Sequence, residues 1–285
     1  MRKNNLFKTI KLAVNNRAKA FHLIEDLHLY AEVYVALLSP HDSLWNEEER
    51  QALEALKLFD TRQQLPLLLA AYRAFYVSQR ELFTRTLKFT VIIAFRYNVI
   101  SGMHTNEQER VYSQTAQDIT AGKIKERTSL LKSLSPLYVS DHVFRSHFNE
   151  KEFLTPNSHQ NKVVRYILLQ LEKKRTQAQY DIGDSTITIE HVYPQRPNQE
   201  WPEEDKHAIY LLGNMTLLER NKNRDCENLG YAKKRAVLSQ STFTTSQQLA
   251  DKYEEWTLAN VYENQRNLAK EAIQIWRIDM PHLSS

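Results

Sequence analysis

TITIEHVYPQ, residues 186–195, sets the character of the C-terminal part of the chain. Its threonines and isoleucines alternate with a period of two, which is typical of a half-buried β-strand. The strand ends in an acid and a histidine, Glu190 and His191. Because neighbouring strand residues point to opposite faces, one of the two can bind a metal while the other faces a substrate. An imidazole with an ordinary pKa of about 6.5 can take a proton from water near neutral pH.

A second informative segment, YLLGNMTLLERNKNRDCEN (210–228), lies downstream of this strand. A Gly-Asn turn ends in Asn214, and a short apolar strand follows from residue 215 to 218. A polar run comes next, in which Asn223 stands nine residues after Asn214. Asparagine is common in turns because it tolerates left-handed conformations, so these residues alone do not define a site. The order predicted here is strand, turn, strand and helix.

The chain on either side of these segments reads as helices. AFHLIEDLHLYAEVYVALL (20–38) has apolar residues at helical spacing and stops before Pro40. In NEEERQALEALKLF (46–59), Asn46 is the expected N-cap and acids fill the first turn. Further helices are predicted over 64–77, 80–97, 106–121, 123–134, 160–177 and 244–276. We therefore expect a mainly α protein, with an all-helical scaffold at 1–180 and a second domain at 181–285.

Composition narrows the class of protein. The 285 residues are 42% hydrophobic and 25% charged, which is ordinary for a globular chain. The single cysteine, Cys226, excludes an internal disulfide and a zinc site built on several thiolates. No apolar run approaches the roughly 20 residues needed to span a bilayer, and the N-terminus does not read as a signal peptide. A cytoplasmic protein without a membrane segment is expected.

Taken together, the two segments resemble the HNH, or ββα-metal, nuclease motif. Glu190, His191, Asn214 and Asn223 fall in order on its positions. The wider pattern, TIEHVYPQ, LLGNMTLLERNKN, ENLGYAKK and RNLAKEAIQIW, resembles the C-terminal nuclease half of GmrSD-type, modification-dependent restriction endonucleases. RYNVISGMHTN (96–106) resembles the helical segment that precedes it in that family. The resemblance extends from about residue 20 onward.

The resemblance implies a role for each matched residue. His191 would be the general base that activates water for attack on phosphorus. Glu190 and Asn223 would give oxygen ligands to one divalent metal, and such ligands suit Mg²⁺ or Mn²⁺. Asn214 would orient the imidazole. Many HNH sites carry histidine where this chain has Asn223, so few protein ligands would hold the metal.

Basic residues gather on the segment that holds the last motif position. Six of them lie between residues 220 and 235 against two acids, which suits contact with a phosphodiester backbone. Arg224, Lys233 and Lys234 are the predicted phosphate contacts, although lysines on exposed helices often serve solubility alone. Gln195, just beyond the first strand, is a candidate substrate-binding or positioning residue.

These features predict a metal-dependent DNA endonuclease or nickase of a bacterial anti-phage restriction system. Its partners would be phage or modified DNA and a nucleotide-binding, modification-sensing domain or subunit, whose motifs this chain lacks. Two alternatives stay open. The fold could be a catalytically decayed DNA-binding adaptor, or the same site could cleave RNA.

Overall fold

The computed structural model describes residues 3–201 and 206–279, and there the chain is mainly helical, as predicted. It divides into two compact units. Unit 1 holds the described residues up to Val91 together with His104–Leu137, and unit 2 holds Ile92–Met103 and Tyr138–Asp279. The chain leaves unit 1 within helix α5 (Arg80–Ile93).

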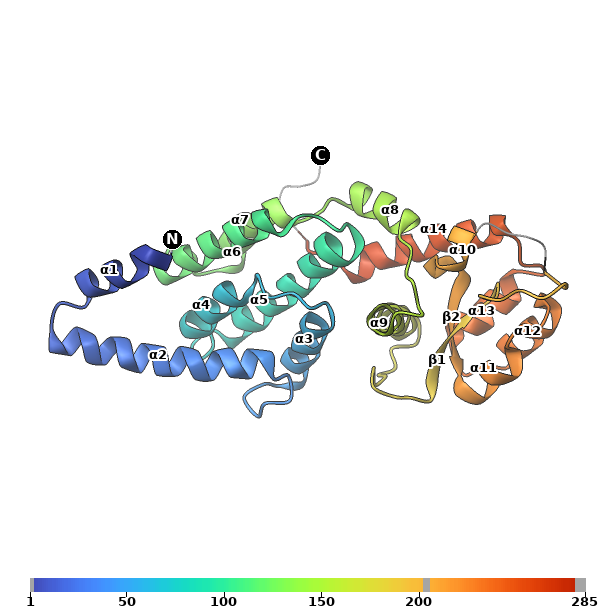
Figure 1. Ribbon diagram of the computed structural model, residues 1–285, viewed down its shortest axis with the longest axis horizontal. Helices are drawn as coiled ribbons and strands as arrows, with labels where there is room; N and C mark the ends of the chain where they lie inside the picture. The colour runs from blue at the N-terminus through green and yellow to red at the C-terminus, as the bar shows by residue number, and fades with distance from the viewer. Residues whose placement is uncertain (1–2, 202–205, 280–285) are drawn as a thin grey trace. The chain divides into compact units, whose positions relative to one another are not determined.

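In its described residues, unit 1 consists of helices and their connections (Figure 1). Asn46 caps one of them through a capping box, in which its side chain accepts from the Glu49 amide and the Glu49 carboxylate accepts from the Asn46 amide. The predicted N-cap is therefore confirmed. Besides the start of α5, the elements are α1 (Lys3–Ala13), α2 (Arg17–Leu38), α3 (Glu47–Leu58), α4 (Leu65–Phe75), α6 (Thr105–Thr120), α7 (Arg127–Leu134) and the 3-10 turn η2 (Ser135–Leu137).

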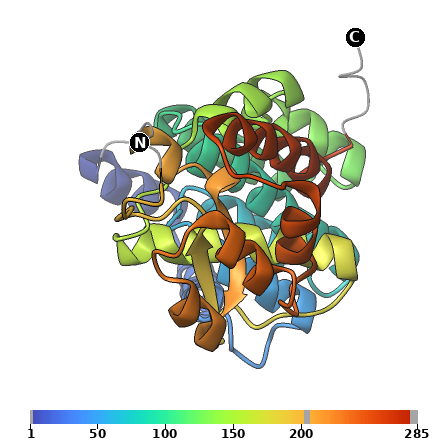
Figure 2. The same cartoon turned by 90° about the vertical axis from the view of Figure 1, so that its right-hand side faces the viewer.

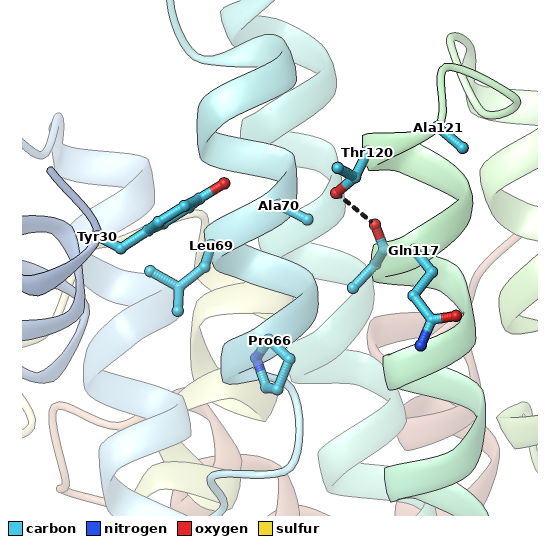
Figure 3. Close-up of a pocket in the computed structure, with 8 residues that line it drawn as sticks. Tyr30, Pro66, Leu69, Ala70, Gln117, Thr120 and Ala121 are labelled. Atoms are coloured by element: carbon cyan, nitrogen blue, oxygen red, sulfur yellow. Dashed lines mark hydrogen bonds between the residues drawn. The ribbon is translucent and has the colours of Figure 1, made fainter. Parts of the chain in front are cut away.

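A shallow, mostly apolar pocket lies on unit 1 between α2, α4 and α6 (Figure 3). Tyr30, Leu69 and Gln117 line it, and the nearby Thr120 hydroxyl donates to the Ala116 carbonyl at 2.9 Å. Among the described residues that line this pocket, none carries a carboxylate, an imidazole or an amine.

Unit 2 contains a two-stranded antiparallel sheet enclosed by helices. Strand β1 (Ile187–His191) pairs with β2 (Met215–Glu219) so that His191 lies opposite Met215, and Figure 2 shows the two strands side by side. Helix α11 (Arg220–Cys226) follows β2 directly. The other elements are η1 (Ala94–Ile100), α8 (Asp141–Glu150), α9 (Ser158–Thr176), α10 (Lys206–Ile209), η3 (Leu212–Asn214), α12 (Tyr231–Leu238), α13 (Thr244–Lys252) and α14 (Leu258–Ile275).

The compact units group the helices differently from the predicted domains, whose boundary near residue 180 stays a prediction. Helices α8 and α9 belong to unit 2, because α8 packs on α14 and α9 packs on both strands and on α13 and α14. Arg165 of α9 also donates to the carbonyls of Asp184 and Ile187, at 2.6 and 3.1 Å. These contacts join residues distant in sequence, so the change from helical to strand pattern did not reveal them.

The tail 244–276 is helical, as predicted, and consists of two helices. The chain leaves α13 at Tyr253, and Thr257 starts α14 with a capping box to Asn260. Tyr253 and Trp256, both buried, occupy the connection. Among the helices of the described residues, none is both long and apolar enough to cross a bilayer.

η3 packs closely on the backbone of α14 at Gly213. A Cβ atom added there would lie 2.3 Å from the Val261 carbonyl oxygen and 2.7 Å from the Gln265 amide nitrogen, both in the α14 backbone. We expect Gly213→Ala to lower the free energy of unfolding by about 1–3 kcal/mol or more, because backbone cannot yield as a side chain does. Urea denaturation measures the change.

Gly183→Ala is the matched control within unit 2. The nearest neighbour of its added Cβ is the Asp181 carboxylate, 3.1 Å away and able to rotate. Equal losses of stability in the two variants would contradict the proposed backbone contact.

Candidate functional site

His191 lies at the end of β1, where its ring meets two polar side chains. Its Nε2 atom is 3.0 Å from Thr155 Oγ1 and 3.3 Å from Gln195 Nε2, and the Gln195 amide donates to Thr155 Oγ1 at 2.7 Å. Burial, and secondarily the positive charge of Lys234, lowers the pKa of His191 to about 4. The imidazole is therefore neutral at pH 7 and can accept a proton.

Thr155 is the residue of this cluster that the sequence did not reveal. It lies in the connection between α8 and α9, in the segment LTPNS (154–158), and is buried. Asn157 of the same segment caps α9 through the amides of His159 and Gln160. A threonine beside a proline in a helix connection carries no signal of its own. Only the packing of α9 on the strands brings its hydroxyl to His191.

Glu190 lies on the other face of β1 and forms a buried ion pair. Lys234 of α12 places Nζ 2.5 Å from Glu190 Oε1 and 2.9 Å from the His191 carbonyl oxygen. Burial raises the pKa of Glu190 to about 7, although the neighbouring ammonium acts in the opposite direction. Lys234 is fully buried, which contradicts its prediction as an exposed phosphate contact. Its ammonium group pairs with the Glu190 carboxylate, because a buried carboxylate without a partner would be costly.

Asn214 is fully buried, and its side-chain amide both accepts and donates hydrogen bonds near the end of β1. Oδ1 accepts from the Tyr193 amide at 2.8 Å and from Trp256 Nε1 at 3.0 Å. Nδ2 donates to the carbonyls of Tyr193 and Ile209, at 2.9 and 3.1 Å. The side chain therefore holds the backbone just after His191. None of these bonds reaches the imidazole, so the predicted orienting role of Asn214 would act through the backbone beyond His191.

Asn223 attaches α11 to the first strand. Its Nδ2 atom donates to the Ile189 carbonyl at 3.0 Å, which leaves the amide oxygen for another partner. Among the described residues no group of three or more histidine, cysteine, aspartate or glutamate side chains is placed to hold a metal ion. A cation here would depend on the amide oxygen of Asn223 and on Glu190, whose carboxylate is already paired with Lys234.

The basic cluster predicted over 220–235 is only partly available to a ligand. Arg224 and Lys233 have side chains that are 77% and 63% exposed, with Lys233 at 3.4 Å from Glu200. The other four cations bind within the domain. Arg220 donates to the Ser185 carbonyl, Lys222 to Glu219 and the Gln240 carbonyl, Lys234 to Glu190, and Arg235 to the Ala250 carbonyl.

The geometry defines a small, helix-rich domain around two antiparallel strands, with a neutral histidine at the end of the first strand. Residues 138–271 match the family model of the C-terminal domain of GmrSD restriction endonucleases. The match supports the resemblance carried by the motifs of this segment. The match begins at Tyr138, where the chain re-enters unit 2, and leaves the preceding helices outside its range. A search of curated proteins gave no match.

The burial of Glu190 makes stability depend on pH, because the folded state favours its protonated form. The folded-state pKa of Glu190, about 7, lies above its ordinary value of 4.5. Its contribution to stability is therefore full below pH 4.5 and is lost as the pH rises through 7. In Lys234→Met the carboxyl loses its cation, so we expect a loss of about 3–5 kcal/mol near neutral pH and a smaller one at pH 5. Urea denaturation at pH 5 and pH 8 measures both.

Lys233→Met is the control, since it removes the neighbouring lysine, which is exposed. A pH-independent loss in Lys234→Met, or the same loss in both variants, would contradict the role given to the buried pair.

Proposed function

We propose that unit 2 is the catalytic domain of a DNA endonuclease of the HNH type, acting in restriction. The observation that carries the proposal is the neutral His191 imidazole at the end of β1, within a domain that matches the GmrSD C-terminal family. The succession of β1, β2 and α11, with Glu190, His191, Asn214 and Asn223 upon it, supports the HNH assignment.

His191 acts as general base in this proposal. We infer the tautomer in which Nε2–H donates to Thr155 Oγ1, 3.0 Å away, because it would fix the plane of the ring and leave Nδ1 to accept the proton. Nδ1 takes that proton from a water molecule as the water oxygen attacks phosphorus, and the bond to the leaving oxygen breaks. Asn214 contributes by fixing the backbone beyond His191. Because the pKa of His191 is near 4, the base is always available at neutral pH but is weak.

The exposed cations hold the substrate. Arg224 and Lys233 extend into solvent from α11 and α12, and each can contact a phosphate oxygen. Gln195, whose Nε2 atom lies 3.3 Å from His191 Nε2, donates in this proposal to the phosphate that is cut. Such contacts read the backbone and not the base sequence, so we infer that choice of DNA comes from a separate nucleotide-binding, modification-sensing domain or subunit.

A divalent metal, Mg²⁺ or Mn²⁺, would be held by Asn223 Oδ1 and the Glu190 carboxylate, both hard oxygen donors. When bound it would stabilise the negative charge that develops on the phosphate. The protein offers few ligands, because Glu190 must leave its ion pair with Lys234 to reach a cation. We therefore expect weak binding, with most of the coordination supplied by water and substrate.

His191→Ala tests the general base. We expect cleavage of a supercoiled plasmid to fall by at least about a hundredfold, because alanine cannot take the proton from water. Thr155→Val, which keeps His191 and removes its hydroxyl partner, should lower the rate by a smaller factor. Gel electrophoresis of time courses also separates nicked from linear product.

His142→Ala is the matched control, since His142 is an exposed histidine on α8 of the same unit. DNA binding measured in parallel should be unchanged in all three variants. Near-normal cutting by His191→Ala would overturn the assignment of the base, and cutting of RNA in place of DNA would change the substrate class.

The metal ligands are tested by titration. Wild-type cleavage should stop in EDTA and return with excess Mg²⁺ or Mn²⁺. Asn223→Ala should need a higher metal concentration for half-maximal rate, by about tenfold, because one of two protein ligands is lost. Asn228→Ala, an exposed asparagine just beyond α11, is the control. Undiminished cutting in EDTA would remove the metal from the mechanism.

A further inference from the structure

A second cavity of unit 2 lies apart from the His191 site. It has a volume of about 430 Å³ and opens between α9, β2, α13 and α14. None of the described residues that line it belongs to the cluster of His191, Thr155 and Gln195. Its walls are apolar where they are deepest, and they are formed by Leu168, Leu171, Met215, Leu249 and Leu268. This combination of size and lining is that of a small-molecule site.

Two hydroxyl groups in this cavity have no hydrogen-bond partner among the described residues. They are Thr245 Oγ1 and Tyr253 Oη, and both residues are buried, at 7% and 5% exposure. Buried hydroxyls are normally satisfied, as Thr216 and Ser246 are by each other at 2.8 Å nearby. Leaving two of them unpaired in one cavity is unfavourable unless a bound molecule supplies the partners.

Three cations and one carboxylate line the cavity, and two of the cations are paired with carboxylates. Lys270 is exposed and has no ion-pair partner among the described residues. Lys252 pairs with Glu263 at 2.6 Å, and Arg175 binds Glu271 through two hydrogen bonds. The first amides of α13 are already taken by the Glu172 carboxylate, so the helix end does not supply an anion site. An anionic ligand group would therefore meet Lys270 and Lys252.

We propose that this cavity binds a nucleoside monophosphate. The leucine walls accept the faces of a base, and the hydroxyls of Thr245 and Tyr253 meet its polar edge. The phosphate lies at the mouth against Lys270 and Lys252. Met215 and Thr216, which line the cavity, pair across the sheet with His191 and Glu190, so the ligand contacts β2 directly behind the proposed catalytic strand end.

Binding is measured on the full chain by isothermal titration calorimetry and by thermal shift. The probes are the common ribo- and deoxyribonucleoside 5′-monophosphates, with the nucleosides and inorganic phosphate as comparisons. At least one monophosphate should bind, more tightly than its nucleoside and than phosphate. Thr245→Val and Tyr253→Phe should each weaken binding by about tenfold, as should Lys270→Gln. Lys162→Gln, an exposed lysine elsewhere on unit 2, should not.

The unliganded variants separate binding from folding. Thr245→Val and Tyr253→Phe remove unpaired hydroxyls, so the melting temperature without ligand should stay level or rise. Binding should also survive in His191→Ala, which keeps this test independent of nuclease activity. The proposal is wrong if no monophosphate binds, if phosphate alone binds equally well, or if the three cavity variants bind as tightly as the wild type.

Discussion

The arrangement of unit 2 depends on one buried amide. Asn214 joins the chain that leaves β1, the chain that enters β2 and the connection before α14, through Tyr193, Ile209 and Trp256. The main chain adds a bond from the Val192 amide to the Asn214 carbonyl. No other side chain of similar size offers two donors and an acceptor in this geometry, because aspartate lacks the donors and leucine lacks both. His191 stands one residue before this cross-link, so its backbone is fixed from both sides.

A buried ion pair, Glu190 with Lys234, also holds the end of β1. Lys234 donates to both Glu190 and the His191 carbonyl, and so connects α12 to the last two residues of β1. Burying two charges costs desolvation free energy that their attraction offsets only with good geometry. We infer that the pair positions the end of β1. A leucine and a methionine would fill the same space but would not hold the carbonyl of His191. The same pairing would make the carboxylate a poor ligand for the proposed metal.

Sequence patterns predicted the elements better than the contacts between them. The helix started by Asn46 and the strand ending at His191 follow from local preferences, and both occur where expected. The hydroxyl of Thr155, the burial of Lys234 and the break at Tyr253 depend on which helix packs on which strand. Periodicity marks a buried face without naming its neighbour. The lysine pair shows this most clearly, since Lys233 and Lys234 are adjacent and identical in type, yet one is exposed and the other fully buried.

The use of cations within the domain also bears on how the substrate is held. Four of the six basic residues between Arg220 and Arg235 bind carbonyls or carboxylates of the domain itself, which leaves Arg224 and Lys233 for phosphate. Affinity for a nucleic acid rises with the number of phosphates that a protein neutralises, and the salt dependence rises with it. Two contacts position a scissile bond but hold a long duplex weakly. In the proposed function, a domain built in this way would perform the chemistry at its strand end and rely on another part of its assembly to bring DNA there.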